Sequence, residues 1–129
     1  MVQLTFFFDR TFGTRLPSVL AKMKPPVRVK WHQEQGFPHK MPDDEWMGVI
    51  GPRNWIAISQ DRKWHLLENE LAAVRQHELG CFYLPSVNRW ESLIQMVTRC
   101  ERMVRLTNET PRPFIYELKG NGRLYRVQI

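Results

Sequence analysis

Apolar runs and amphipathic stretches alternate along the first two thirds of the chain. Short, mostly apolar runs are typical of strands that are covered on both faces, as in a parallel sheet. Four segments predict such strands: residues 4–8, 27–31, 55–59 and 81–84. Between them apolar residues recur at helical spacing, which predicts helices over residues 14–24, 43–50 and 63–79. We expect buried apolar faces on the first and third helices, made of Leu16, Val19, Leu20, Met23, Leu67, Leu71 and Val74.

This alternation of strand and helix is typical of an α/β fold with a central parallel sheet and helices on its faces. A long amphipathic helix is predicted over residues 88–107. The last segment predicts a hairpin, with strands at 114–119 and 123–129 around Gly120-Asn121-Gly122. A chain of 129 residues suits one domain. We expect a core over about residues 3–84 and an extension over 85–129.

The composition, with 43% hydrophobic and 25% charged residues, is that of a globular protein and argues against wholesale disorder. No apolar run approaches the roughly 20 residues that span a bilayer. The short apolar run at 4–8 ends at Asp9 and has no basic segment before it, unlike a signal peptide. We therefore expect a cytoplasmic protein that is not associated with a membrane.

The net charge of +6 is concentrated in the extension, where residues 85–129 hold eight basic and four acidic side chains. A basic surface favours polyanions. Arg99, Arg102 and Arg105 recur at helical spacing and form one row, which is either a solvated helix face or a track for phosphates. The two cysteines and four scattered histidines do not make a zinc site, and we expect the histidines to be exposed or satisfied.

Three aspartates are expected at one edge of the sheet. Asp9 and Asp61 each follow a predicted strand, and Asp43 opens the helix before the third strand. In an open α/β sheet, ligands bind outside the carboxyl ends of the strands. Converging carboxylates repel one another unless a hard cation such as Mg²⁺ or Mn²⁺ binds between them, and such an ion supports phosphodiester hydrolysis. Each aspartate can also be explained as a turn residue or a helix cap.

The residues around these acids resemble the PIN-like domain of VapC-type toxins. The resemblance covers about residues 3–84, in the branch with a D-x-E-W segment before a [ST]-x-D-R strand end. It rests on Phe6-Phe7-Phe8-Asp9, Pro42-Asp43-Asp44-Glu45-Trp46 and Ile58-Ser59-Gln60-Asp61-Arg62. It implies a PIN-like three-layer α/β/α fold. It also implies a metal-dependent endoribonuclease, the toxin component of a type II toxin–antitoxin system.

The resemblance implies roles for individual residues. It makes Asp9, Asp43 and Asp61 ligands of Mg²⁺ or Mn²⁺, with Glu45 completing the catalytic set. Either Asp43 or Glu45 is the central ligand, and Asp44 adds to that ambiguity. Three neighbours would support the site or contact the substrate: Ser59, Arg62 and Lys63.

One acid of the family pattern has no clear counterpart, because the stretch after Asp61 reads Arg62-Lys63-Trp64-His65. Glu68 is a weak candidate for that position, so we expect one firmly held ion. Trp64 either touches RNA together with Lys63 or anchors the core, and we expect the tryptophans in general to serve packing.

The resemblance implies an RNA substrate and a cognate antitoxin protein as partners, and it leaves a homodimer open. The alternative is a non-catalytic PIN-like module that binds RNA or a protein partner, which the missing acid favours. A phosphotransfer receiver domain is disfavoured because no convincing lysine stands at the end of the fourth strand.

Overall fold

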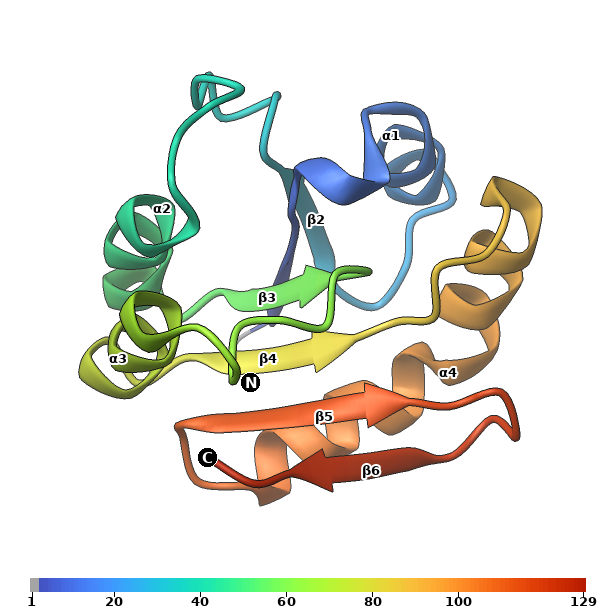
Figure 1. Ribbon diagram of the computed structural model, residues 1–129. Coiled ribbons are helices and arrows are strands. Elements are labelled where there is room, and N and C mark those ends of the chain that lie inside the picture. The colour runs from blue at the N-terminus through green and yellow to red at the C-terminus, as the bar shows by residue number, and fades with distance from the viewer. Residues whose placement is uncertain (1–2) are drawn as a thin grey trace.

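The computed structural model describes residues 3–129, which form one six-stranded sheet in the order β2-β1-β3-β4-β5-β6 (Figure 1). The first five strands in this order run parallel, and β6 is antiparallel to β5. The strands are β1 (Thr5–Phe8), β2 (Arg28–Trp31), β3 (Ile56–Ser59), β4 (Gly80–Tyr83), β5 (Phe114–Leu118) and β6 (Leu124–Val127).

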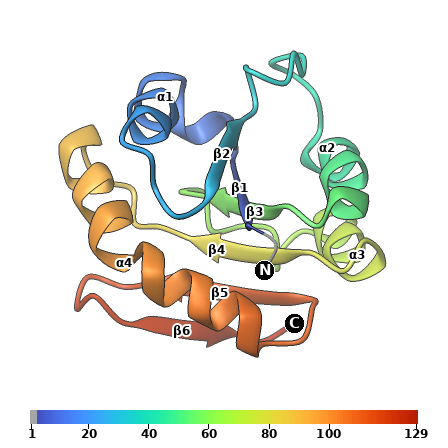
Figure 2. The same ribbon diagram turned by 180° about the vertical axis from the view of Figure 1, so that it is seen from behind.

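Four helices cover the sheet in two layers. They are α1 (Arg15–Lys22), α2 (Asp43–Ile50), α3 (Glu68–Gln76) and α4 (Arg89–Glu109). Two short 3₁₀ turns, η1 (Arg10–Phe12) and η2 (Gly51–Arg53), follow β1 and α2. Helices α1 and α4 lie on one face and α2 and α3 on the other (Figures 1 and 2). The three-layer α/β/α fold expected from the sequence is confirmed.

Strand β1 shows why a continuous apolar run is needed in the middle of this sheet. Phe6 and Phe8 point into the cluster formed with α1 and α4, whereas Phe7 points into the cluster formed with α2 and α3. All three side chains are fully buried. Because side chains alternate between the faces of a strand, both faces of β1 must be apolar.

Two predicted helices differ in detail. Helix α3 begins at Glu68 rather than at residue 63, because residues 63–67 form turns that bury Trp64 and leave Leu67 exposed. In α1 the buried residues include Leu16 and Leu20, but Val19 and Met23 are 44% and 51% exposed. The expectation that Leu67, Val19 and Met23 are buried is therefore wrong.

The predicted hairpin exists, and it also extends the sheet. Strand β5 pairs in parallel with β4, from Gly80 opposite Phe114 to Tyr83 opposite Glu117. The turn after β5 therefore lies at the same edge as the ends of β1, β3 and β4 (Figure 1). No helix within residues 3–129 is long and apolar enough to cross a membrane.

We predict that Phe7→Ala destabilises the fold by about 3–5 kcal/mol. The Phe7 ring is fully buried, with its centroid 5.0 Å from that of Trp46, 5.9 Å from Phe37 and 6.3 Å from Trp55. Urea denaturation measures the loss. Trp90→Ala is the control, because Trp90 is 70% exposed and its removal should change stability by no more than about 0.5 kcal/mol. If Phe7→Ala and Trp90→Ala lower the free energy of unfolding by the same amount, the burial of Phe7 does not contribute to stability as predicted.

Candidate active site

Asp9 is a buried carboxylate at the carboxyl end of β1. Its side chain is 2% exposed and caps η1, where one carboxylate oxygen accepts from the Thr11 amide at 3.1 Å and from the Thr11 hydroxyl. The Thr11 hydroxyl in turn accepts from the amide of Gln60, which follows β3. Asp9 is therefore held between the ends of two neighbouring strands, β1 and β3.

Burial raises the pKa of Asp9 from 3.8 to about 7. Hydrogen bonds from Ser59 and Thr11 oppose this shift, and the negative charge of Asp43 adds to it. Asp43 thus adds a small unfavourable interaction with the charged form of Asp9.

Asp43 is held by two indole groups. One carboxylate oxygen accepts from Trp46 Nε1 at 3.1 Å, and the other accepts from Trp64 Nε1 at 2.9 Å. Asp43 is 5% exposed, and both tryptophans are fully buried. Trp64 is therefore a core anchor and does not lie on an RNA-binding surface, which decides between its two readings.

Arg10 brings the nearest positive charge to this pair of acids. Its guanidinium lies 3.5 Å from Asp43 and donates to the carbonyl oxygens of His39 at 3.0 Å and Met41 at 2.6 Å. The sequence analysis did not single out Arg10, because its contacts are 29 to 33 residues away along the chain. Asp43 was considered as a helix cap, but it is the first residue of α2, and Pro42 takes the capping position.

Asp61 follows β3, as predicted, but its side chain is exposed, unlike those of Asp9 and Asp43. It is 51% exposed and pairs with Lys63 at 3.3 Å, while its amide donates to the buried Ser59 hydroxyl at 3.0 Å. Arg62 pairs with Glu117 of β5 at 2.8 Å. Of the other acids, Glu45 and Glu68 are exposed and Asp44 is half-buried.

Within residues 3–129, no three carboxylate, imidazole or thiol side chains form a group that could hold a metal ion. Asp9 and Asp43 nevertheless suit a divalent ion. A carboxylate has about four acceptor positions, so the two indoles leave Asp43 free to bind a cation. Asp61 would have to leave Lys63 to join them, and an exposed ion pair costs only about 0–1 kcal/mol to break. The donor set therefore fits one ion once Asp61 turns inward.

His32 is a buried residue of this edge that the sequence analysis misjudged. It follows β2, its amide donates to the carbonyl of Phe8 at 3.0 Å, and its side chain is fully buried. Neither ring nitrogen has a hydrogen-bond partner among the described residues, so His32 is neither exposed nor satisfied. Burial and the charge of Arg10 lower its pKa, which favours the neutral imidazole. Its position after a strand was the only sequence signal.

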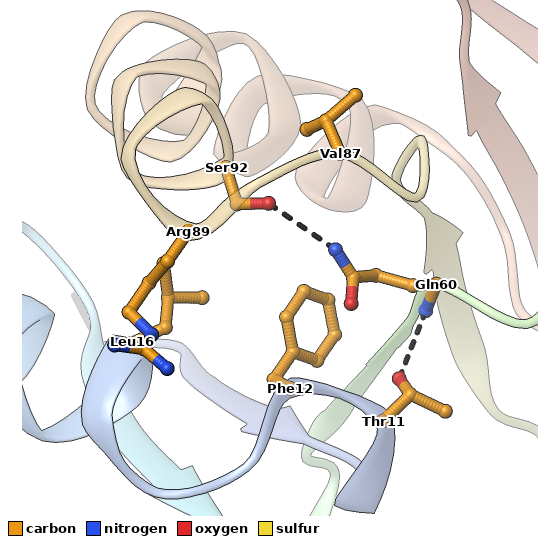
Figure 3. A pocket seen from close by; sticks show the side chains of 7 residues that line it. All are labelled: Thr11, Phe12, Leu16, Gln60, Val87, Arg89 and Ser92. Carbon is orange, nitrogen blue, oxygen red and sulfur yellow. Dashed lines mark hydrogen bonds between the residues drawn. The ribbon is translucent and has the colours of Figure 1, made fainter.

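A polar cavity of about 180 Å³ is lined in part by Thr11, the residue that hydrogen-bonds Asp9 (Figure 3). Thr11 and Gln60 stand on one side, and Ser92, near the start of α4, accepts from the Gln60 side chain at 3.2 Å. Arg89 adds a guanidinium, and the first turn of α4 adds the positive end of a helix dipole. This combination suits an anion such as a phosphate. The lining residues are Thr11, Phe12, Leu16, Gln60, Val87, Arg89 and Ser92.

We predict that Asp9→Asn stabilises the metal-free chain at pH 8, by on the order of 4 kcal/mol. Because folding raises the pKa of Asp9 from 3.8 to about 7, its ionisation over that interval destabilises the folded state. The asparagine oxygen can still accept from Thr11. The gain should shrink as the pH falls from 7 and vanish below about pH 4.

Urea titrations in EDTA at several pH values measure this difference. Glu45→Gln is the control: Glu45 is exposed in the first turn of α2, so its change should stay under about 1 kcal/mol. A difference between wild type and Asp9→Asn that is the same at pH 4 and pH 8 would contradict the assignment.

A family model described as "PIN like domain" matches residues 4–86. This segment contains β1 to β4, η1, α1 to α3 and all three acidic motifs. Comparisons with curated proteins and with solved structures gave no match. The match spans most of the chain, and the three-layer architecture agrees with it. The chain therefore belongs to the PIN-like domain family, whose fold is of the nuclease type.

Proposed function

We propose that this protein is a metal-dependent endoribonuclease and the toxin of a type II toxin–antitoxin system. The observation that carries the proposal is the pair of buried carboxylates, Asp9 and Asp43, at the edge of a PIN-like sheet. Burying two like charges together costs stability, and such an arrangement is typical of functional sites. The RNA substrate implies a cytoplasmic enzyme.

Asp9, Asp43 and Asp61 are the proposed ligands of one Mg²⁺ or Mn²⁺. When bound, such an ion activates water and neutralises charge on the phosphate. The indoles of Trp46 and Trp64 fix the orientation of Asp43, and the Thr11 hydroxyl fixes that of Asp9. Both carboxylates are thus pre-oriented, and Asp61 is the adjustable one.

The neighbouring residues have supporting roles in this proposal. Ser59 holds the backbone at Asp61 and hydrogen-bonds Asp9. Lys63 can pass from Asp61 to a phosphate of the substrate, since both partners are partly exposed. Arg62 keeps the loop after β3 against β5 through Glu117, and Glu45, exposed on α2, is the acid left to accept a proton. The cavity beside Asp9 is where we place the scissile phosphate.

A non-catalytic PIN-like module is the second candidate. Two observations favour it: the acids do not form a complete ligand group, and Arg10 already balances the charge of Asp43. Such a module would keep the fold and bind RNA or a protein without cleaving RNA.

A groove between α1 and α4 is the proposed docking surface for the antitoxin. Val19, Trp90 and Leu93 line its apolar part, and Arg15 and Arg89 flank it. Ile94 and Val97 extend the apolar surface along α4, with 44% and 52% of their surface exposed. An apolar surface between arginines suits an amphipathic helix with acidic flanks. A symmetric second copy would bring arginines against arginines.

We predict that the purified chain cleaves RNA only with Mn²⁺ or Mg²⁺, and that Asp9→Asn and Asp61→Asn each lower the rate at least about a hundredfold. A panel of structured and single-stranded RNAs in Mn²⁺ or EDTA measures this. Glu68→Gln, an exposed acid outside the proposed ligands, is the control and should retain wild-type activity.

Cleavage that persists in both aspartate variants would come from a contaminant. If no form cleaves RNA, and Mn²⁺ does not raise the melting temperature, the non-catalytic module becomes the better description.

We predict that Val97→Glu weakens antitoxin binding at least about tenfold, because a bound antitoxin would bury an unpaired carboxylate on the apolar surface that continues the groove along α4. The co-expressed antitoxin, titrated onto each variant, measures the affinity. Thr98→Glu adds the same charge one residue further along α4, at another exposed position, and should bind normally. Equal binding by Val97→Glu and wild type would place the antitoxin elsewhere. If instead the mass of the wild-type protein in solution doubles as its concentration rises, and that of Val97→Glu does not, the groove is the contact with a second copy of the chain.

A further inference from the structure

A second cavity, remote from the acids in sequence, lies between α4 and the hairpin. Its volume is about 350 Å³. Arg99 and Arg102 of α4 and Arg123 of the hairpin line it, together with Gly122, Leu124 and Tyr125. None of these lining residues is acidic. The cavity lies entirely in the segment that follows the family match, which ends at residue 86.

The three arginines have no carboxylate partner within residues 3–129. The ion pairs among residues 3–129 involve the basic residues Arg10, Lys30, Arg62 and Lys63 instead. Guanidinium groups that surround one cavity repel each other, and a bound anion would relieve that repulsion. Guanidinium groups also match phosphate geometry through paired N–H donors.

One of these arginines lies against the hairpin turn. Gly122 has a φ of +80°, a conformation that residues with side chains rarely adopt, so the turn favours glycine at this position. The Arg99 guanidinium lies next to this glycine, so α4 and the turn meet at the cavity. The row of arginines on α4 is thus part of a cavity wall at Arg99 and Arg102, and is more than a solvated helix face.

Tyr125 adds an aromatic ring beside the arginines. It is 40% exposed, and its hydroxyl accepts from Asn121 Nδ2 at 2.8 Å. Lys119 Nζ lies 5.3 Å from its ring centroid and brings a fourth positive charge. Basic side chains that follow a backbone, combined with an exposed aromatic ring for a base, are the usual means of binding single-stranded nucleic acid.

The cavity is placed to serve the acidic edge. The turn after β5 lies at the same edge of the sheet as the ends of β1 and β3 (Figure 1). The Arg62–Glu117 ion pair joins the loop that carries Asp61 to β5. A single strand of nucleic acid bound in the cavity can therefore continue along this edge of the sheet towards Asp9 and Asp61.

We propose that this cavity is a binding site for single-stranded RNA, in which Arg99, Arg102 and Arg123 hold phosphates and Tyr125 stacks on a base. This inference rests on the proposed function, because it takes the bound RNA to be the substrate of the nuclease. Binding of RNA requires neither metal nor cleavage, so the binding site and the nuclease activity can be refuted separately.

The test is fluorescence anisotropy of a labelled single-stranded RNA in EDTA, over a range of salt concentrations. Arg102→Gln combined with Arg123→Gln removes two exposed charges and should weaken binding on the order of tenfold. It should also make the slope of log K against log salt shallower by about 1.4. Lys22→Gln with Arg28→Gln removes two exposed charges near β2, the opposite edge strand, and should change neither quantity.

Tyr125→Ala should weaken binding of RNA but leave binding of inorganic polyphosphate unchanged, since polyphosphate has no base to stack. Equal losses in the two double variants would overturn the proposal, because net charge alone would then explain binding. Unchanged binding in Arg102→Gln with Arg123→Gln would also overturn it. If the wild-type chain cleaves RNA but Arg102→Gln with Arg123→Gln binds RNA as tightly as wild type, only the proposed binding site is refuted. If that double variant binds RNA more weakly but no form of the chain cleaves RNA, only the proposed nuclease activity is refuted.

Discussion

The carboxylate of Asp43, held between the indoles of Trp46 and Trp64, connects the elements of the candidate site. Trp46 lies on the same helix, but Trp64 belongs to the loop after β3, so the two hydrogen bonds tie α2 to that loop. A buried carboxylate must have such partners, because an unpaired charge in the core is far more costly than the bonds are worth. The loop is therefore drawn inward at Trp64, and α3 can begin only at Glu68.

The same constraint orders the charges around the sheet edge. Arg10 completes the surroundings of Asp43, and the Thr11 hydroxyl links Asp9 to the loop after β3. Asp9 and Asp43 become fixed and buried, while Asp61 stays on the surface with Lys63. The candidate site thus combines two buried, hydrogen-bonded acids with one exposed acid. The buried imidazole of His32, which has no hydrogen-bond partner among residues 3–129, lies at the end of the neighbouring strand.

The extension, residues 85–129, brings positive charge into the same sheet as the acids. Strand β5 joins the sheet in parallel and carries its turn to the edge where the acids lie, and α4 crosses it on one face, behind β5 in Figure 1 and in front of it in Figure 2. The positive charge of the chain is concentrated in this part, away from the buried carboxylates. The buried carboxylates and the arginine-lined cavity thus occupy different parts of one molecule, which is the arrangement that the proposed binding of single-stranded RNA uses.

The sequence by itself determined the elements that depend on local pattern. The Phe6-Phe7-Phe8 run specified a strand buried on both faces, and Asp9 and Asp61 were placed at strand ends because residues after parallel strands share one edge. The hairpin followed from its glycine turn. Only the tertiary structure decided what depends on contacts between distant parts of the chain: the inward position of Trp64, the pairing of Arg10 with Asp43, the burial of His32 and the exposure of Asp61. Trp64 and Arg10 reach Asp43 across 21 and 33 residues of the chain, and neither periodicity nor spacing predicts such pairings.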